Sequence, residues 1–215
     1  MTCQPASTYL WFLGAFLSGS VPFGLLLMKM AGKGDVRASG SGNIGATNVM
    51  RVGGKPLGIA TLALDAAKGF LPVFLAGRAG MGPALLGFVA LAAMCGHVFT
   101  PWLKFKGGKG VATALGGVLA YHAAMVLPAL GVFLALVLIF RYVSLGSIMA
   151  ALTLILTACG LFGAWFTVPV PAADCGARWA VLAWIALGGL VIVKHHQNIG
   201  RLLKGTESRF WGKKN

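Results

Sequence analysis

Residues 111–140 read VATALGGVLAYHAAMVLPALGVFLALVLIF, an apolar stretch of 30 residues without Asp, Glu, Lys or Arg. As a single helix it would be about 45 Å long, whereas the hydrocarbon core of a bilayer is about 30 Å thick. We therefore interpret the stretch as two short membrane spans. Inside it, His122 and Pro128 predict the hairpin that joins them.

The composition of the whole chain agrees with a membrane protein. Hydrophobic residues make up 58% and charged residues 10% of the 215 residues, and the mean hydropathy is +0.84. Soluble domains carry roughly 25% charged residues. The apolar segments are much longer than the ~10-residue alternating strands of a membrane barrel. The sequence therefore predicts an all-α integral membrane protein.

Five further apolar segments flank the first stretch and complete a prediction of seven transmembrane helices in one domain, residues 1–215. They cover residues 9–28, 57–76, 83–100, 144–166 and 179–193. Pro22 falls inside the first segment, and a Pro-rich loop at 169–178 precedes the last. The first segment lacks a basic start and a clear cleavage site, so we expect no cleaved signal peptide.

The basic residues are distributed very unevenly over the loops. Of the 18 Lys and Arg residues, 15 fall on one side of a seven-span arrangement, Arg78 and Arg178 fall on the other, and Lys68 lies within a span. Cytoplasmic loops of membrane proteins are enriched in Lys and Arg. This predicts a cytoplasmic C-terminus and an extracytoplasmic N-terminus. It also accounts for the net charge of +14 without a nucleic-acid partner.

Three polar segments fall on the predicted cytoplasmic side. The first, residues 41–51, reads SGNIGATNVMR. Glycines let a backbone approach a ligand closely, Ser, Thr and Asn offer uncharged hydrogen-bonding groups, and Arg51 offers a fork of donors that suits phosphate. The segment is typical of a site for a phosphorylated, hydroxylated ligand. The alternative from composition alone is a solvated turn.

The second polar segment, residues 104–110, reads KFKGGKG, and the third, residues 194–207, reads KHHQNIGRLLKGTE. Free backbone N–H groups around Gly107 and Gly108, together with the start of the next span, predict an anion-binding nest. In the third segment, His195 and Asn198 are three positions apart and share a helical face. Glu207 is one of only four acidic residues.

Other kinds of site are disfavoured. The glycines at 40, 42 and 45 match G-x-G-x-x-G, but no buried strand precedes them and no acid follows about 20 residues later. The acidic residues are too scattered for a divalent metal cluster. No His is followed by Asp with the spacing His-x4-Asp, the mark of the common acyl-CoA glycerolipid acyltransferases. We therefore expect neither a metal nor a cofactor.

Two polar residues inside the second predicted span need partners. Asp65 and Lys68 are three positions apart, and charges are costly in lipid, so they pair with each other or line a polar interior. A structural pair and a pair that supports a site both remain open. His97, near the end of the third span, is interpreted as a packing histidine.

Three classes of function fit these patterns. A transporter or channel for phosphorylated metabolites would also use basic loops and glycines, but it predicts charge near the bilayer midplane and paired halves, and no halves repeat here. A phospholipid-binding structural protein would not need His195 and Asn198 beside two anion-binding loops. An enzyme that acts on a phosphorylated ligand is the third class.

These segments, with residues 65–69 and 141–144, resemble the bacterial acyl-phosphate:glycerol-3-phosphate acyltransferases, the PlsY family. The resemblance covers nearly the whole chain, in order and at the right spacing. It implies a multi-pass, seven-helix enzyme of the bacterial inner membrane with its active site on the cytoplasmic face. The implied reaction acylates the 1-hydroxyl of glycerol 3-phosphate from an acyl phosphate and yields lysophosphatidic acid. It also implies a functional link to the enzyme that makes acyl phosphate.

The resemblance and the chemistry together assign roles to individual residues. Arg51 and Lys104 are expected to hold glycerol 3-phosphate, the glycine segment to hold the acyl phosphate, and Glu207 to fix the tail. The predicted catalytic residues are His195, Asn198, Ser41 and Arg51. The predicted substrate-binding residues are Asn43, Thr47, Asn48, Lys104, Gly107, Gly108, Lys109, Gly110, Ser144 and Glu207.

Two of the four cysteines, Cys3 and Cys175, fall on the predicted extracytoplasmic side. That side is oxidising in a Gram-negative cell, so a disulfide between them is possible. Cys95 and Cys159 lie in predicted spans and are interpreted as small core residues.

Overall fold

The computed structural model describes residues 7–160 and 175–210. These residues form helices and connecting loops, with no strand among them. The helices are α1 (Ser7–Ser20), α2 (Phe23–Met30), α3 (Ala46–Gly53), α4 (Lys55–Arg78), α5 (Pro83–Val98), α6 (Val111–Tyr121), α7 (Ala123–Phe140), α8 (Val143–Ala158), α9 (Cys175–Lys194) and α10 (His196–Leu203), with short 3-10 turns η1 (Val36–Ala38) and η2 (Pro101–Leu103).

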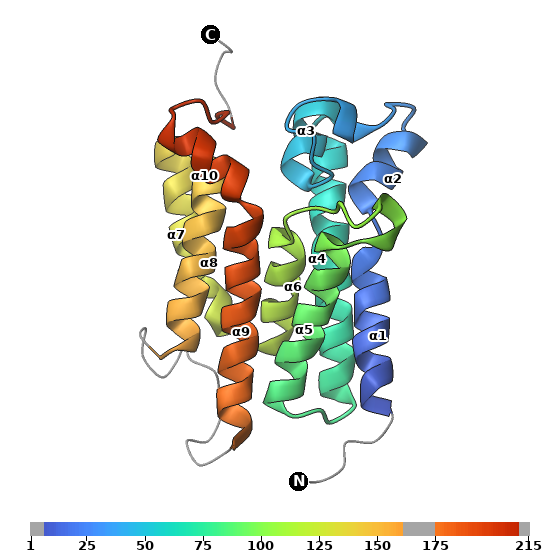
Figure 1. Cartoon of the computed structure of the whole chain (residues 1–215), viewed down its shortest axis with the longest axis vertical. Helices are drawn as coiled ribbons and strands as arrows, with labels where there is room; N and C mark the ends of the chain where they lie inside the picture. The colour runs from blue at the N-terminus through green and yellow to red at the C-terminus, as the bar shows by residue number, and fades with distance from the viewer. Residues whose placement is uncertain (1–6, 161–174, 211–215) are drawn as a thin grey trace. The chain divides into compact units, whose positions relative to one another are not determined.

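The chain divides into two compact units. We call Met1–Tyr121 the N-terminal unit and His122–Asn215 the C-terminal unit, and each is described by itself. In the N-terminal unit, α1, α4, α5 and α6 run side by side (Figure 1). In the C-terminal unit, α8 packs against both α7 and α9, and α10 contacts α8 and α9.

Glycines allow the helices of the N-terminal unit to approach closely. A Cβ atom added at Gly19 of α1 would overlap the carbonyl oxygen of Ala93 in α5, and one added at Gly96 of α5 would overlap the carbonyl oxygen of Phe16. The same kind of contact recurs between α4 and α6. Small residues at helix interfaces are typical of membrane bundles, because lipid offers no hydrophobic force that drives helices together.

The first predicted span, 9–28, is interrupted. α1 ends at Ser20 and α2 begins at Phe23, with Val21 and Pro22 between them. Proline lacks the N–H group that would continue the helical hydrogen bonds, so the break falls where the sequence places it. The carbonyl oxygen of Val21 accepts a hydrogen bond from Nζ of Lys68 at 2.7 Å, which satisfies one backbone group that the break exposes.

The stretch 111–140 contains two helices, as its length predicts. The break lies at His122, which has extended backbone angles (φ −159°, ψ 103°). The predicted contribution of Pro128 is wrong, since this residue lies inside α7. Another boundary needs correction: residues 175–178, expected to close the Pro-rich loop, belong to α9. The rest of that loop lies outside the described residues.

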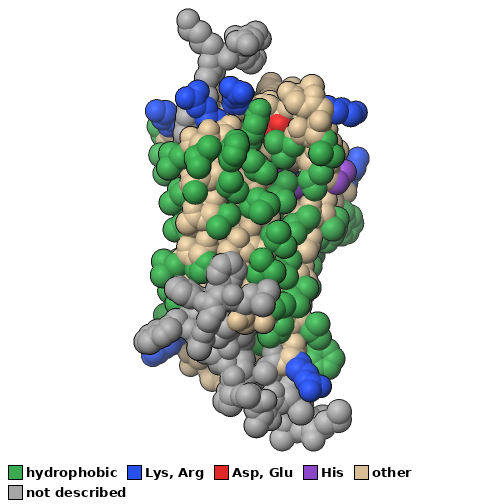
Figure 2. Space-filling view, turned by 90° about the vertical axis from the view of Figure 1, so that its left-hand side faces the viewer, with side chains coloured by type: hydrophobic (Ala, Val, Ile, Leu, Met, Phe, Trp, Pro, Cys, Tyr) green, Lys and Arg blue, Asp and Glu red, His purple; other side chains and the backbone are tan. Residues whose placement is uncertain are grey.

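Among the described residues, four helical segments are long and apolar enough to cross a membrane, or five if α9 and α10 form one bent span. The four cover Thr8–Met30, Lys55–Arg78, Pro83–Leu103 and Ala123–Phe140. The axes of α9 and α10 differ by 53°, and α6 and α8 are shorter apolar helices. On the face seen in Figure 2, apolar side chains cover the middle, and Lys and Arg lie toward the ends. The protein is therefore an all-helical membrane protein.

Candidate functional site

The polar loop 36–45, which leads into α3, is organised by the side chain of Asn48. Its Nδ2 donates hydrogen bonds to the carbonyl oxygens of Val36 (3.0 Å), Ser39 (3.1 Å) and Asn43 (2.9 Å). Its Oδ1 accepts a hydrogen bond from the backbone N–H of Ser41 at 2.8 Å. Asn48 is only 2% exposed. One amide therefore closes the loop upon itself, and this side chain is occupied by the protein's own backbone.

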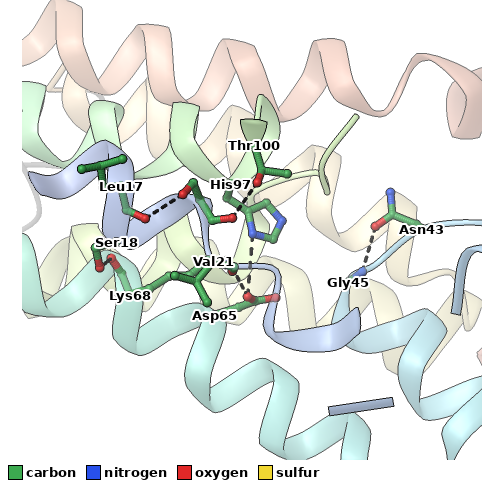
Figure 3. A network of polar contacts seen from close by, with 10 residues as sticks. Leu17, Ser18, Val21, Asn43, Gly45, Asp65, Lys68, His97 and Thr100 are labelled. Atoms are coloured by element: carbon green, nitrogen blue, oxygen red, sulfur yellow. Dashed lines mark hydrogen bonds and ion pairs between the residues drawn. The ribbon is translucent and has the colours of Figure 1, made fainter. Parts of the chain in front are cut away.

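Other predicted residues of this loop remain at the surface. Ser41 is exposed, and Arg51 lies exposed in the last turn of α3. Thr47 is half-buried in the first turn of the same helix. Asn43 is also half-buried, and its Oδ1 accepts a hydrogen bond from the backbone N–H of Gly45 at 2.9 Å (Figure 3). The loop thus has a buried amide, that of Asn48, at its centre, and polar and cationic side chains closer to its surface.

A small apolar core anchors this loop and the second one together. It consists of buried side chains from α2, η1, the loop before α3, α3 itself and η2: Leu25, Met28, Val36, Ile44, Val49 and Leu103. Because Leu103 immediately precedes Lys104, the lysine-glycine segment 104–110 starts from the same core as the loop around Asn48. Both loops therefore lie at one end of the N-terminal unit (Figure 1).

Arg37, at the start of the first loop, forms an ion pair with Asp35, which offsets its charge. The guanidinium of Arg37 lies 2.6 Å from the carboxylate of Asp35, and the Asp35 side chain also accepts from the backbone N–H of Arg37. Hydrogen bonds from Arg37 lower the pKa of Asp35 to about 2. Asp35 therefore stays ionised at every physiological pH and offsets the charge of Arg37. Within the described part of the chain, Arg51 forms no ion pair with an acidic residue.

The second loop, residues 104–110, has an unusual backbone. Lys104 and Phe105 have positive φ angles of 53° and 62°, a left-handed conformation that non-glycine residues adopt rarely. The backbone N–H groups of Gly107 and Gly108 donate to the carbonyl oxygens of Val98 (3.1 Å) and His97 (3.2 Å). The expectation that these two amides are free to bind an anion is therefore wrong. They fasten the loop to the end of α5.

The groups that follow these glycines are placed differently. Lys109 is half-buried, Gly110 has a positive φ of 80°, and α6 begins at the next residue. The first N–H groups of an α-helix have no acceptor within the helix, and the helix dipole favours negative charge there. Of the predicted anion-binding nest, Lys109 and the first turn of α6 remain as candidate groups to bind an anion.

In the C-terminal unit, the carboxylate of Glu207 collects three side chains. Its Oε1 accepts hydrogen bonds from Oγ of Ser144 and Nδ2 of Asn198, both at 2.6 Å, and its Oε2 accepts from Nε of Arg201 at 2.7 Å. These residues come from α8, α10 and the segment after α10. Glu207 therefore fastens the tail to α8 and fixes the amide of Asn198.

The charge of Glu207 is stable at physiological pH. Partial burial raises its pKa, but the hydrogen bonds from Ser144, Arg201 and Asn198 outweigh this effect, and the pKa falls below its usual value. Because the pKa is lowered, the stability that the hydrogen bonds to the Glu207 carboxylate contribute is fully present at pH values above the ordinary glutamate pKa of 4.5. It is lost only as the pH falls through the lower, folded-state value.

His195 lies at the junction of α9 and α10 and not within either helix. Its Nδ1 is 2.8 Å from the carbonyl oxygen of Val191, and the residue is 2% exposed. Because a carbonyl only accepts, Nδ1 carries a proton. His196 and Gln197 are exposed, whereas His195 and Asn198 are buried. Their burial agrees with the expected orientation, but His195 precedes α10, so the helical face predicted to be shared with Asn198 stays a prediction.

Sequence reasoning missed two residues that the structure places in these clusters. Arg201 contacts Glu207, and its signal in the sequence was its position three residues after Asn198, on the same face of a helix. His97, interpreted as a packing histidine, lies against Gly108 and 3.7 Å from the carboxylate of Asp65. The predicted pairing of Asp65 with Lys68 is confirmed at 2.7 Å.

The remaining predictions concern metals and disulfides. Within the described ranges, no group of three or more His, Cys, Asp or Glu side chains is arranged to hold a metal ion. The proposed pairing of Cys3 with Cys175 lies outside what the structure describes, because Cys3 and the side chain of Cys175 are not among the described parts. Cys95 and Cys159 are free thiols.

Comparison with known proteins supports one family. A family model described as glycerol-3-phosphate acyltransferase matches residues 9–205. The chain is 50% identical over 200 residues to the glycerol-3-phosphate acyltransferase of Trichlorobacter lovleyi, covering 93% of this chain and 96% of that protein. It is 49% identical over 205 residues to the corresponding protein of Syntrophotalea carbinolica, covering 95% and 98%.

Two solved structures have the same fold. The crystal structure of PlsY, an integral membrane glycerol 3-phosphate acyltransferase, in its glycerol 3-phosphate form superimposes with a TM-score of 0.85, 39% identity and 96% coverage of both chains. The lysophosphatidic acid form of PlsY gives 0.82, 38% and 95%. With a family model that spans most of the sequence and relatives near 50% identity, the chain belongs to the glycerol-3-phosphate acyltransferases of the PlsY family and is an integral membrane acyltransferase.

Proposed function

We propose that the protein transfers a fatty acyl group from acyl phosphate to the 1-hydroxyl of glycerol 3-phosphate, giving lysophosphatidic acid and inorganic phosphate. The observation that carries this proposal is the lysophosphatidic acid form of PlsY, which matches 95% of this chain. The sequence lacks the His-x4-Asp motif of the common acyl-CoA glycerolipid acyltransferases, which agrees with a different donor. Two cation-bearing loops at one end of the N-terminal unit agree with a reaction between two phosphate-bearing substrates, an acyl phosphate and a phosphate ester.

The reaction places modest demands on the protein. The glycerol hydroxyl oxygen attacks the acyl carbonyl carbon, a tetrahedral oxyanion forms, and the bond between carbonyl carbon and phosphate oxygen breaks. The hydroxyl proton leaves to a base or to a substrate phosphate. Because phosphate is a good leaving group, the main task is to bring two anions together against their repulsion, which fixed cationic groups offset.

The proposed roles follow the geometry of each loop. Lys109 and the first turn of α6 would receive the phosphate of the donor, and Gly107 and Gly108 would shape that surface without donating hydrogen bonds. Arg51 and Lys104 would hold the phosphate of glycerol 3-phosphate. Ser41, Asn43 and Thr47 would bind its hydroxyls, while Asn48 would act by holding the loop.

In the C-terminal unit, the proposed roles belong to buried groups. His195 would use Nε2 to orient the reacting hydroxyl, since Nδ1 faces Val191. Asn198, held by Glu207, would orient a second polar group of the substrates. Ser144 shares the same carboxylate and would keep the tail in place.

We also propose seven membrane spans, with the C-terminus and the loops around Asn48 and Gly108 in the cytoplasm of a bacterial inner membrane. The uneven distribution of Lys and Arg supports this orientation. The acyl chain would enter from the lipid, and the water-soluble substrate from the cytoplasm. A functional link to the enzyme that supplies acyl phosphate follows, because acyl phosphates hydrolyse readily in water.

A direct assay tests the proposed function. Purified protein in detergent or nanodiscs should convert palmitoyl phosphate and radiolabelled glycerol 3-phosphate to lysophosphatidic acid. Palmitoyl-CoA in a parallel reaction should yield no product. Product from palmitoyl-CoA alone would reverse the donor assignment, and absence of product from both donors would refute the proposal.

Replacing His195 tests how the proton is removed. A substrate phosphate has a second pKa near ~6 and histidine near ~6.5, so either group can accept the proton. We expect His195→Gln to retain measurable turnover with a nearly unchanged pH profile, because glutamine places an amide close to the position of Nε2. A positioned base contributes about 10²–10⁴-fold.

The opposite outcome has a distinct signature. If His195→Gln abolishes turnover, leaves substrate binding intact and removes the limb of the rate profile near pH ~6–7, then His195 is the base. Gln197→Ala provides a matched control two residues away, because Gln197 is exposed and is not among the residues that hydrogen-bond to Glu207.

A further inference from the structure

The imidazole of His97 lies between the buried carboxylate of Asp65, seen in Figure 3, and the glycine loop. Its Nδ1 is 3.7 Å from Oδ1 of Asp65. On its other side, a Cβ atom added at Gly108 would overlap Nε2, so the backbone of Gly108 rests directly on that edge of the ring. His97 is 4% exposed. A single side chain thus joins the interior of the N-terminal unit to the loop 104–110.

The carboxylate side of this arrangement is rigidly held. Asp65 and Lys68 lie three residues apart on α4, their side chains meet at 2.7 Å, and each is 3% exposed. Nζ of Lys68 also donates to the carbonyl oxygen of Val21 at 2.7 Å, in the break between α1 and α2. The group that faces His97 is therefore fixed by α4 and by the interrupted first span.

The loop side is held by backbone contacts as well as by the ring. The N–H of Gly107 donates to the carbonyl oxygen of Val98, and the N–H of Gly108 donates to that of His97 itself. A Cβ atom at Gly107 would overlap the same His97 carbonyl oxygen. The loop is consequently pressed against the last turn of α5, with the imidazole beneath Gly108, one residue before Lys109.

We propose that His97 is a positioning residue: supported by Asp65 and Lys68, it sets the height and orientation of the loop that carries Lys109 and the start of α6. The assignment of this loop to the donor phosphate rests on the function proposed above. His97 does not touch the substrate in this scheme. It acts through Gly108, because the Gly108 backbone loses its packing contact when the ring moves or a smaller side chain replaces it.

Two replacements of His97 separate the two edges of the ring. His97→Asn keeps a polar group near the position of Nδ1, opposite Asp65, and removes the edge beneath Gly108. His97→Gln keeps a polar group near the position of Nε2. If the ring supports the loop, the asparagine variant is the more damaging, and the glutamine variant restores part of the loss.

Hydrogen–deuterium exchange measures the position of the loop without any substrate. His97→Asn should raise the exchange rate of the Gly107 and Gly108 amides by roughly tenfold, the equivalent of one weakened hydrogen bond, while the amides of α4 and α5 stay protected. The matched control is Thr61→Val: Thr61 is fully buried on α4, and its hydroxyl bonds only to Leu57 within that helix. Thr61→Val should leave the exchange rates of the Gly107 and Gly108 amides unchanged.

Kinetics provide the second readout. With palmitoyl phosphate and glycerol 3-phosphate, His97→Asn should raise the KM of the donor by roughly tenfold. It should raise the KM of glycerol 3-phosphate less, because Lys104 lies at the start of the loop, before the segment that rests on His97. Inhibition by inorganic phosphate should weaken in parallel. Asp65→Asn, if the variant folds, should shift the same two quantities in the same direction.

The outcomes are separable. Unchanged exchange in the loop of His97→Asn, or faster exchange spread over α4 and α5, overturns the proposal. So does an unchanged donor KM in a variant whose loop exchanges faster. If the wild-type protein does not use acyl phosphate at all, the proposed donor is wrong, and the exchange measurement still decides whether His97 positions the loop.

Discussion

Replacing Glu207 by alanine should lower kcat/KM by about 10²-fold, the size of effect expected when a catalytic group moves by about 1 Å. The carboxylate accepts from Ser144, Asn198 and Arg201. Its removal leaves the buried groups Ser144 and Asn198 without this acceptor, at about 1–3 kcal/mol for each buried polar group left unsatisfied. The tail then loses its attachment to α8, and Asn198 loses its fixed orientation.

The measurement combines steady-state kinetics with limited proteolysis near residues 200–210. Glu207→Gln should give an intermediate kcat/KM. Its amide oxygen still accepts one hydrogen bond, whereas its NH2 group faces donors of the cluster and cannot accept from them. Thr206→Ala is the matched control, since Thr206 is the exposed neighbour of Glu207. Wild-type activity in Glu207→Ala, with an intact tail, would show that the cluster does not position Asn198.

Replacing Gly108 by alanine should lower kcat/KM for the acyl donor by at least about 30-fold, chiefly through a higher donor KM. The added methyl group would occupy the position of His97 Nε2, so either the ring or the loop has to move. Lys109→Ala should also raise the donor KM, because it removes a cation from the proposed phosphate site.

Gly14→Ala is the matched control for this substitution. Gly14 lies in α1 of the same unit, and a Cβ atom there would meet nothing within 4 Å. Separate titrations of the two substrates decide the assignment. If Gly108→Ala raises only the KM of glycerol 3-phosphate, the two substrate sites have been exchanged in our proposal.

The helices were largely predictable from apolar length, and their interruptions were predictable in part. The stretch 111–140 exceeds the bilayer thickness and contains two helices, and the break is at His122 as predicted, whereas Pro128 lies inside α7. In the first span, Pro22 does interrupt the helix. The difference depends on tertiary partners: Lys68 satisfies a carbonyl at the break beside Pro22, and such a contact between distant segments has no local signature.

For the candidate site, the sequence singled out three polar segments, but it did not show how each group in them is bonded. Asn48 resembles a substrate ligand by composition, whereas its amide binds four backbone groups of its own loop. The amides of Gly107 and Gly108 resemble a free nest, whereas they bond to the end of α5. A sequence motif shows which polar groups are present, whereas only the folded structure shows which of them already form hydrogen bonds within the protein.

The spacing of Asp65 and Lys68 also bears on how the protein is made. A lone charge at the centre of a membrane helix costs about 3 kcal/mol during insertion by the translocon. Because the two opposite charges lie within one turn of α4 and meet at 2.7 Å, they can neutralise each other as soon as that helix forms. The segment Lys55–Arg78 can therefore enter the bilayer before α5, which carries His97, has been synthesised.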